Sequence, residues 1–223
     1  GLHRYGTVEG LQALTPRDLF AHYRKVLAES PVDIFIVGDV DPDEAVRWVQ
    51  ESMPFPRGQV QAMKEPVTRW PQQVREKVEE EDVHQGILAL GLRTRVRYPD
   101  EGYERLLVYN GILGGFPHSK LFVNVREKAS LAYFAHTRLD ATKGILMAIA
   151  GIDPRQYRKA RDIIQRQVDD MAQGRISREE LEATRKALIH QLRTVGDSAL
   201  GLIGNHLLGL VNGRLRPPQE TIR

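Results

Sequence analysis

The sequence predicts an α+β fold, in which a largely antiparallel sheet carries helices packed on one face. Short apolar runs of strand length come in adjacent pairs, and stretches with a helical period of about 3.6 residues lie between these pairs. Adjacent strands joined by short turns favour antiparallel pairing, whereas parallel strands need a long crossover between them. A stretch rich in proline and glycine, residues 54–71, interrupts both patterns and divides the chain.

The first block opens with a clear helix start. A helix is predicted over residues 15–28, because Thr15 can cap its first turn and Asp18 stands where a capping-box acid belongs. A buried strand is expected over residues 32–37, which read Val-Asp-Ile-Phe-Ile-Val. A second helix is predicted over residues 41–53, since an aspartate again precedes a proline at the first helical position.

The second block supplies the predicted sheet and its helical layer. Strands are predicted over residues 74–79, 84–92, 131–138 and 144–152, and helices over residues 100–113, 119–128 and 154–171. A capping box from Ser177 to Glu180 predicts a long last helix, which Gly196 and Asp197 interrupt. We expect strands 84–92 and 144–152 inside the sheet, and the polar strand 74–79 nearer an edge.

This order of elements predicts a domain organisation. We interpret residues 1–53 as the C-terminal portion of a domain that begins upstream, residues 54–71 as a linker, and residues 72–223 as a domain that folds by itself. The first residues contain neither a methionine nor an apolar signal core, so we expect the sequence to start inside a longer polypeptide.

Composition excludes several classes of function. The chain has 223 residues, no cysteine, and 32 basic against 29 acidic residues, a net charge of +3 that gives no case for nucleic-acid binding. Arg93, Arg95 and Arg97 are spaced by two, as on one face of a strand end. No run approaches the roughly 18 apolar residues that a membrane helix needs. We therefore expect no membrane partner, and the absence of cysteine favours a cytoplasmic location.

No motif for catalysis or metal binding is present. None of the seven histidines forms H-x-x-E-H or H-E-x-x-H, and none lies four residues from another histidine. No G-x-S-x-G elbow or phosphate loop occurs, and a cysteine nucleophile is excluded. The sequence therefore predicts no catalytic residue and no metal site in this chain, which should be inactive alone.

One group of short motifs is distinctive. It reads Leu113-Gly114-Gly115, Ser119-Lys120-Leu121-Phe122, Val125-Arg126-Glu127-Lys128 and Leu131-Ala132-Tyr133. This block resembles the C-terminal domain of pitrilysin/insulinase-type (inverzincin) zinc metallopeptidases, which include the mitochondrial processing peptidases. The family's "v-v-G-d" strand resembles residues 36–40, and its "G-i-t-e-e-E-L" helix start resembles residues 174–181. The resemblance thus covers nearly all of the chain.

The resemblance implies a role in peptide binding. Family members consist of similar α+β halves that close around a substrate, and one half supplies zinc through H-x-x-E-H. The other half supplies an Arg and a Tyr, seven residues apart, that contact the substrate backbone; Arg126 and Tyr133 match this spacing here. Zinc is then expected in the other half of the parent protein. The sequence departs from the family at residues 116–118, where a third glycine is usual, and at Lys120, where Arg is common.

Two functions remain open at this point. The chain is either the substrate-clamping, non-zinc-binding part of an active zinc endopeptidase, or part of a catalytically silent member that partners an active subunit. Its expected partners are the N-terminal half of the same polypeptide or an H-x-x-E-H-bearing subunit, a peptide substrate, and a second copy in a homodimer. A purely structural role would place Arg126 in a local ion pair and Tyr133 in the core or at its rim. A fragment without assignable activity is the third alternative.

Overall fold

The computed structural model describes residues 5–53, 58–60 and 70–222. The chain divides into two compact units, residues 1–66 and residues 67–223, and each is described here by itself. The boundary between the units falls inside the stretch predicted as a linker, most of which lies outside the described residues. The linker therefore stays a prediction.

The first unit consists of helices joined by extended chain. Its helices are α1 (Val8–Ala13), α2 (Pro16–Glu29) and α3 (Pro42–Ser52). The predicted capping box of α2 is present, with the Asp18 N–H donating to Thr15 Oγ1 and the Thr15 N–H donating to the Asp18 carboxylate. Asp41 caps α3 by accepting from the Glu44 N–H at 2.9 Å. Both predicted helices are confirmed, while α1 was not predicted.

The predicted buried strand at residues 32–37 is wrong. The segment is extended but pairs with no other strand among the described residues, and Ile34 and Ile36 are 47% and 50% exposed. An apolar strand becomes buried only when neighbouring strands and a covering layer meet it, and the described part of this unit offers neither. The segment and α3 instead enclose an open, mainly apolar hollow of about 660 Å³.

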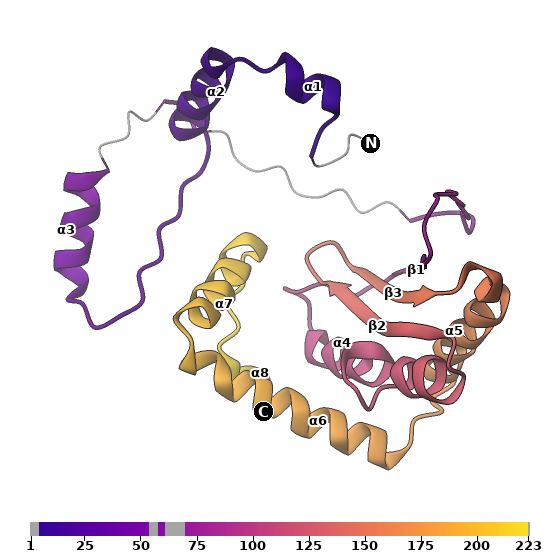
Figure 1. The fold of residues 1–223 in the computed structure, drawn as a ribbon. Coiled ribbons are helices and arrows are strands. Elements are labelled where there is room, and N and C mark those ends of the chain that lie inside the picture. Colours follow the sequence, from indigo (N-terminus) through magenta and orange to yellow (C-terminus); the bar gives the residue numbers. More distant parts are fainter. Residues whose placement is uncertain (1–4, 54–57, 61–69, 223) are drawn as a thin grey trace. The chain divides into compact units, whose positions relative to one another are not determined.

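The second unit is built on a three-stranded antiparallel sheet. The strands β1 (Gly86–Arg93), β2 (Ala132–Asp140) and β3 (Ile145–Ile152) lie in the order β1-β3-β2. Helices α4 (Tyr103–Asn110) and α5 (Tyr157–Ala172) contact one face of this sheet, as Figure 1 shows. The α+β class, the antiparallel pairing and the one-sided helical layer are therefore as predicted.

Two details of the predicted sheet are wrong. Residues 74–79 form no strand, and Val74 is fully exposed. The strand predicted over residues 84–92, β1, consequently lies at an edge of the three-stranded sheet rather than inside it. The segment 74–79 is mostly charged, so pairing it with β1 would bury little apolar surface to offset the loss of chain entropy.

The helical layer contains two unusual turns. The π-helices η1 (Gly111–Gly115) and η2 (Phe122–Lys128) follow α4, where regular helix was predicted. A short 3₁₀ turn, η3 (Pro154–Gln156), leads into α5. Beyond it lie α6 (Arg178–Arg193), the 3₁₀ turn η4 (Thr194–Asp197), α7 (Ala199–Asn212) and α8 (Pro218–Ile222). The predicted capping box at Ser177 and the predicted break at residues 196–197 are confirmed.

The core of the second unit lies between the sheet and this layer. Alternate residues of β3 are almost fully buried and meet apolar side chains of both π-helices and α5. The most buried members are Ile112, Leu113, Leu121, Val125, Ala135, Leu146, Ala148, Ala150, Ile152, Ala160 and Ile164.

A second, smaller cluster surrounds Tyr98 and Tyr103. Arg216, which is 4% exposed, donates to the Tyr98 carbonyl at 2.9 Å and to the Asp100 carbonyl at 2.7 Å. It also forms an ion pair with Glu104, and its guanidinium lies 5.2 Å from the centre of the Tyr103 ring. Burial raises the pKa of Tyr103 to about 12. The segment before α8 is thereby fixed to the loop before α4.

Candidate functional site

Arg126 lies on the π-helix η2 and is exposed. Its guanidinium carbon sits 4.6 Å from the centre of the Phe122 ring, one turn back along the same helix. No carboxylate among the described residues forms an ion pair with it. Its guanidinium N–H donors thus face solvent rather than a local acid, and π-turns of this kind occur frequently at functional sites.

Tyr133 lies at an irregular position of β2. Ala132 pairs with Ile152 and Phe134 pairs with Gly151, so Tyr133 is an extra residue in the strand, as in a β-bulge. Its side chain is 71% exposed and lies outside both core clusters. Because a bulge changes the direction of a side chain relative to the regular alternation, it presents the phenol to solvent at the start of the strand.

A short connection joins the two residues. Ser130 has a φ of +51°, in the left-handed region that non-glycine residues seldom adopt. The Leu131 N–H donates to the Val125 carbonyl at 3.1 Å. This hydrogen bond holds the chain that leaves η2 against the end of that helix. A π-turn, a left-handed residue and a bulge therefore follow one another between Arg126 and Tyr133. Such backbone features persist only where the surroundings hold them in place.

The glycines of the sequence block provide part of that support. A Cβ on Gly114 would lie 2.6 Å from the Thr137 backbone nitrogen, and a Cβ on Gly111 would lie 2.5 Å from the Thr184 Cγ2. The absence of side chains at these positions lets η1 pack directly against β2 and α6. The glycines are thus packing positions, in agreement with the lack of a phosphate-loop motif.

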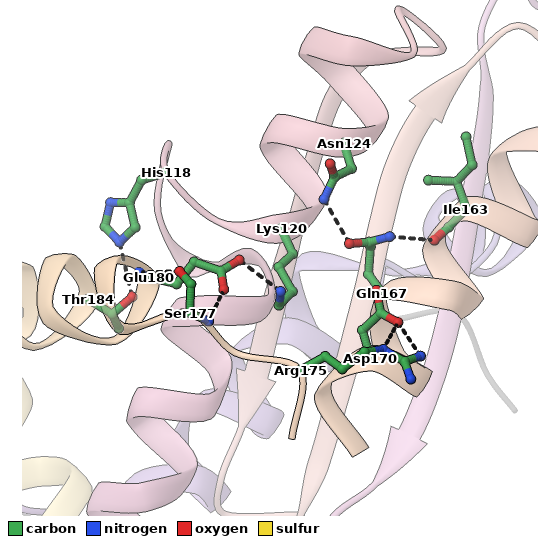
Figure 2. Close-up of polar contacts among 10 residues, drawn as sticks. All are labelled: His118, Lys120, Asn124, Ile163, Gln167, Asp170, Arg175, Ser177, Glu180 and Thr184. Atoms are coloured by element: carbon green, nitrogen blue, oxygen red, sulfur yellow. Dashed lines mark hydrogen bonds and ion pairs between the residues drawn. The ribbon is translucent and has the colours of Figure 1, made fainter. Parts of the chain in front are cut away.

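Two polar contacts fix α6 to the turn that follows the glycines. Lys120 Nζ lies 2.8 Å from Glu180 Oε1, and His118 Nε2 lies 3.0 Å from Thr184 Oγ1. Figure 2 marks both contacts with dashed lines. Lys120, which is only 8% exposed, therefore has its charge compensated by an acid of the α6 capping box. His118 also stacks on Phe116, with the ring centres 5.3 Å apart. The residues that depart from the family pattern thus make the contacts to α6.

The pKa of Glu180 reflects this environment. Burial acts to raise it, but hydrogen bonds from Lys120 and from the Ser177 N–H outweigh burial and hold the pKa below its ordinary value. Glu180 is consequently ionised at neutral pH. Sequence reasoning missed this pair because the two residues are 60 positions apart, although a lysine within an otherwise apolar helical stretch was a signal that it needed a partner.

A third contact holds η2 itself. Asn124 Nδ2 donates to Gln167 Oε1 at 2.8 Å, and Gln167 is a buried residue of α5 (Figure 2). The π-helix that carries Arg126 is therefore tied by a polar contact to α5, while the preceding turn is tied to α6. These contacts position the segment from Arg126 to Tyr133 against the helical layer.

The described residues offer no metal site, since no three His, Asp or Glu side chains among them gather to hold an ion. The His, Asp and Glu side chains of the described residues are therefore not arranged to hold a catalytic zinc ion. In the part of the chain that the structure describes, no helix is both long and apolar enough to cross a membrane.

Known proteins resemble this chain over most of its length. The chain is 35% identical over 201 residues to the "Probable inactive metalloprotease YmfF" of Bacillus subtilis, which covers 90% of this chain and 47% of that protein. The crystal structure of a conserved protein from Enterococcus faecalis shares 32% identity and superimposes with a TM-score of 0.79, covering 99% of this chain and 55% of that one. The chain thus spans about half the length of the relatives it matches.

Two further matches agree with the sequence resemblance. The crystal structure of a peptidase M16 inactive domain from Pseudomonas fluorescens shares the fold, with a TM-score of 0.74 at 19% identity over 98% of this chain and 53% of that one. Residues 13–188 match the family described as "Peptidase M16 inactive domain". The resemblance to pitrilysin/insulinase-type peptidases is confirmed, and the chain belongs to the peptidase M16 inactive domain family.

Proposed function

We propose that this chain is the non-zinc-binding part of an M16-type metallopeptidase and that it helps to enclose and bind a peptide substrate. The observation that carries the proposal is the exposure of Arg126 and Tyr133 on one irregular but well-supported segment. In this proposal residues 1–53 complete a domain that begins upstream, residues 54–71 are a linker, and residues 72–223 form the substrate-clamping domain.

The two side chains suit the chemistry of peptide binding. A guanidinium offers several N–H donors and a phenol offers one O–H donor, and peptide carbonyl oxygens are acceptors. When a nucleophile attacks a peptide carbonyl, its oxygen gains negative charge, and donors already aimed at that position stabilise it. The zinc and the attacking water would belong to the other half of the parent protein, so this chain's part is to bind and orient the peptide.

The second candidate function is a catalytically silent partner of an active zinc peptidase. It is favoured by the relative from Bacillus subtilis, which is named as a "Probable inactive metalloprotease". In that case Arg126 and Tyr133 bind peptide for an H-x-x-E-H-bearing subunit in another chain. The sequence of the parent's other half separates the two candidates: an intact H-x-x-E-H favours the enzyme, and a degenerate motif favours the partner.

A peptide-cleavage assay on the assembled parent protein, or on its complex with an active subunit, tests the proposal. Because loss of one donor of an oxyanion site slows turnover by roughly a hundred- to a thousandfold, Tyr133→Phe should lower turnover on that scale. Arg126→Ala should do the same, and the melting temperature should change little in either variant since both side chains are exposed. Arg166→Ala on α5, also exposed, is the matched control. Wild-type rates from both site variants would show that these residues are structural.

The setting of the protein is part of the same proposal. We place it in the cytoplasm, supported by the absence of cysteine from all 223 residues. A homodimer is a further candidate assembly, supported by the exposed apolar residues of segment 32–37. Sedimentation of the purified chain tests the dimer, and a monomer at all concentrations would contradict it.

A further inference from the structure

One face of the second unit's sheet carries no helix. The helices and both π-turns contact the face that contains the alternately buried residues of β3, and the opposite face carries no helix among the described residues of this unit (Figure 1). The side chain of Gln85 covers only its end, at Gly151. We call this opposite face the open sheet face. Its positions follow from strand register and alternation, and its central members are Ile145, Met147, Ile149, Phe134, His136 and Arg138.

The middle of the open sheet face is apolar, and small residues lie along one side of it. Ile145, Met147 and Ile149 form a stripe along the central strand, and each is half-buried although no layer covers it. On β1 the stripe is bordered by Ala89 and Gly91, which pair with Ile149 and Met147 and have small side chains or none. An uncovered apolar stripe beside such small residues is the kind of surface on which another molecule packs.

The two ends of the open sheet face differ in character. At one end Phe134 lies against Gly151 and its ring centre is 5.5 Å from that of His136, next to the bulge at Tyr133. At the other end the exposed side chains of Arg93 and Arg138 project from β1 and β2. The face is therefore aromatic near the proposed peptide site and cationic about four residues further along β2.

The cations at the second end have no acidic partner among the described residues. Arg93 donates only to the Lys143 carbonyl, at 3.3 Å, and no ion pair involves Arg138. The nearest acid of this face by register is Asp140, and it is already paired with Lys143 at 3.4 Å. The two exposed guanidinium groups are thus available to pair with an acidic ligand.

We propose that the open sheet face selects extended, mainly apolar peptide segments that carry an acidic residue, with Arg93 and Arg138 recognising the acid. This inference rests on the proposed function, because the same peptide would have its backbone at Tyr133. Arg138 is four residues beyond Phe134 on β2, which corresponds to about 13 Å of extended chain. An extended peptide covers that distance in about four residues, so the acid lies roughly four residues from the position beside the aromatic end.

Fluorescence anisotropy with the 223-residue chain tests the proposal. The probes are labelled peptides with identical apolar residues and Glu, Gln or Lys at the same position. We expect the Glu peptide to bind about three- to tenfold more tightly than the Gln peptide and the Lys peptide to bind least, with the differences shrinking as salt is added. Equal affinity for the Glu and Lys peptides would overturn the inference.

Variants separate this inference from the proposed function. The Arg93→Gln/Arg138→Gln double variant should remove the preference for Glu, and Arg138→Gln alone, which breaks no contact given by the structure, should reduce it. Arg166→Gln on α5 should keep the full preference. Tyr133→Phe should weaken all three peptides alike and leave the preference intact. A preference that survives the double variant would overturn the inference alone, whereas failure of wild-type chain to bind any of the peptides would overturn the proposed function as well.

Discussion

At the scale of single residues, the buried charged side chain of Lys120 is more informative than the exposed charged ones. Lys120 was identified from the sequence only as a departure from a family pattern, but it is a buried cation whose partner, Glu180, also caps α6. The pairing could not be predicted, since sequence spacing gives the partners of residues within a helix but not across 60 positions. Arg126 and Tyr133 could be named from the motif, while the π-turn and the bulge that expose them could not.

The buried pair makes stability depend on pH. A carboxyl whose pKa is lowered on folding contributes stability above its unfolded value, near 4.5, and this contribution is lost as the pH falls through the folded pKa. Lys120→Met removes the main hydrogen bond that lowers the pKa. We therefore expect its free energy of unfolding to fall below that of the wild type at pH 7, and the gap to narrow as the pH drops below 4.5.

Urea unfolding at a series of pH values measures this difference. Lys186→Met, an exposed change on α6, is the control and should give a nearly constant difference. A gap that stays the same from neutral to acid pH would mean that Glu180 does not depend on Lys120 for its charge.

At the scale of elements, helices were predicted better than strands. The starts of α2, α3 and α6 follow from caps that lie within three residues of the helix, so local sequence is enough to find them. The segments 32–37 and 74–79 were predicted as strands and are not, because strand formation depends on partners elsewhere in the chain. The hairpin of β2 and β3 was found since its two strands are neighbours in sequence.

Contact between elements depends on the glycine block. Gly114→Ala would place a methyl group 2.6 Å from the Thr137 backbone nitrogen. This distance is too short for a van der Waals contact, so η1 or β2 would have to shift. Overpacking of this kind costs about 1–3 kcal/mol, more than the roughly 1 kcal/mol that alanine gains over glycine in a helix. The variant should therefore be less stable in thermal or urea unfolding.

Gly196→Ala provides the comparison for that measurement. No atom lies within 4 Å of a Cβ at this position, which is in the 3₁₀ turn η4. Its stability should equal or slightly exceed that of the wild type. Similar stabilities for the two alanine variants would show that η1 can move away from β2 at little cost.

At the scale of the whole molecule, the chain combines a proposed substrate-binding surface with the lack of a sequence motif for catalysis. The family and the fold class could be predicted from the sequence, because the motif block is specific and its helices and hairpin are local. The open sheet face could not, since it depends on which side of the sheet the helical layer covers. From the sequence, Arg93 could be identified only as one of three arginines spaced by two at a strand end, and nothing placed it near Arg138.

The division of roles predicts that this chain alone does not hold catalytic zinc. The described residues bring no three ligand side chains together, and no motif spaces two histidines for one ion. Metal analysis of the purified chain after dialysis should find far less than one equivalent. A full equivalent of tightly held zinc, on His and carboxylate ligands, would contradict the assignment of this chain to the non-catalytic role.

The anchoring of Arg216 has a consequence for how the protein forms on the ribosome. The hydrogen bond from Arg216 to the Tyr98 carbonyl spans 118 positions, whereas the large core is complete by Met171. During synthesis the sheet and α5 can pack together before Arg216 has been translated. Tyr98 and Tyr103 gain their contacts with its guanidinium only afterwards. Until then these two tyrosines lack their cationic cover, so we expect this corner of the nascent chain to become ordered after the sheet and α5.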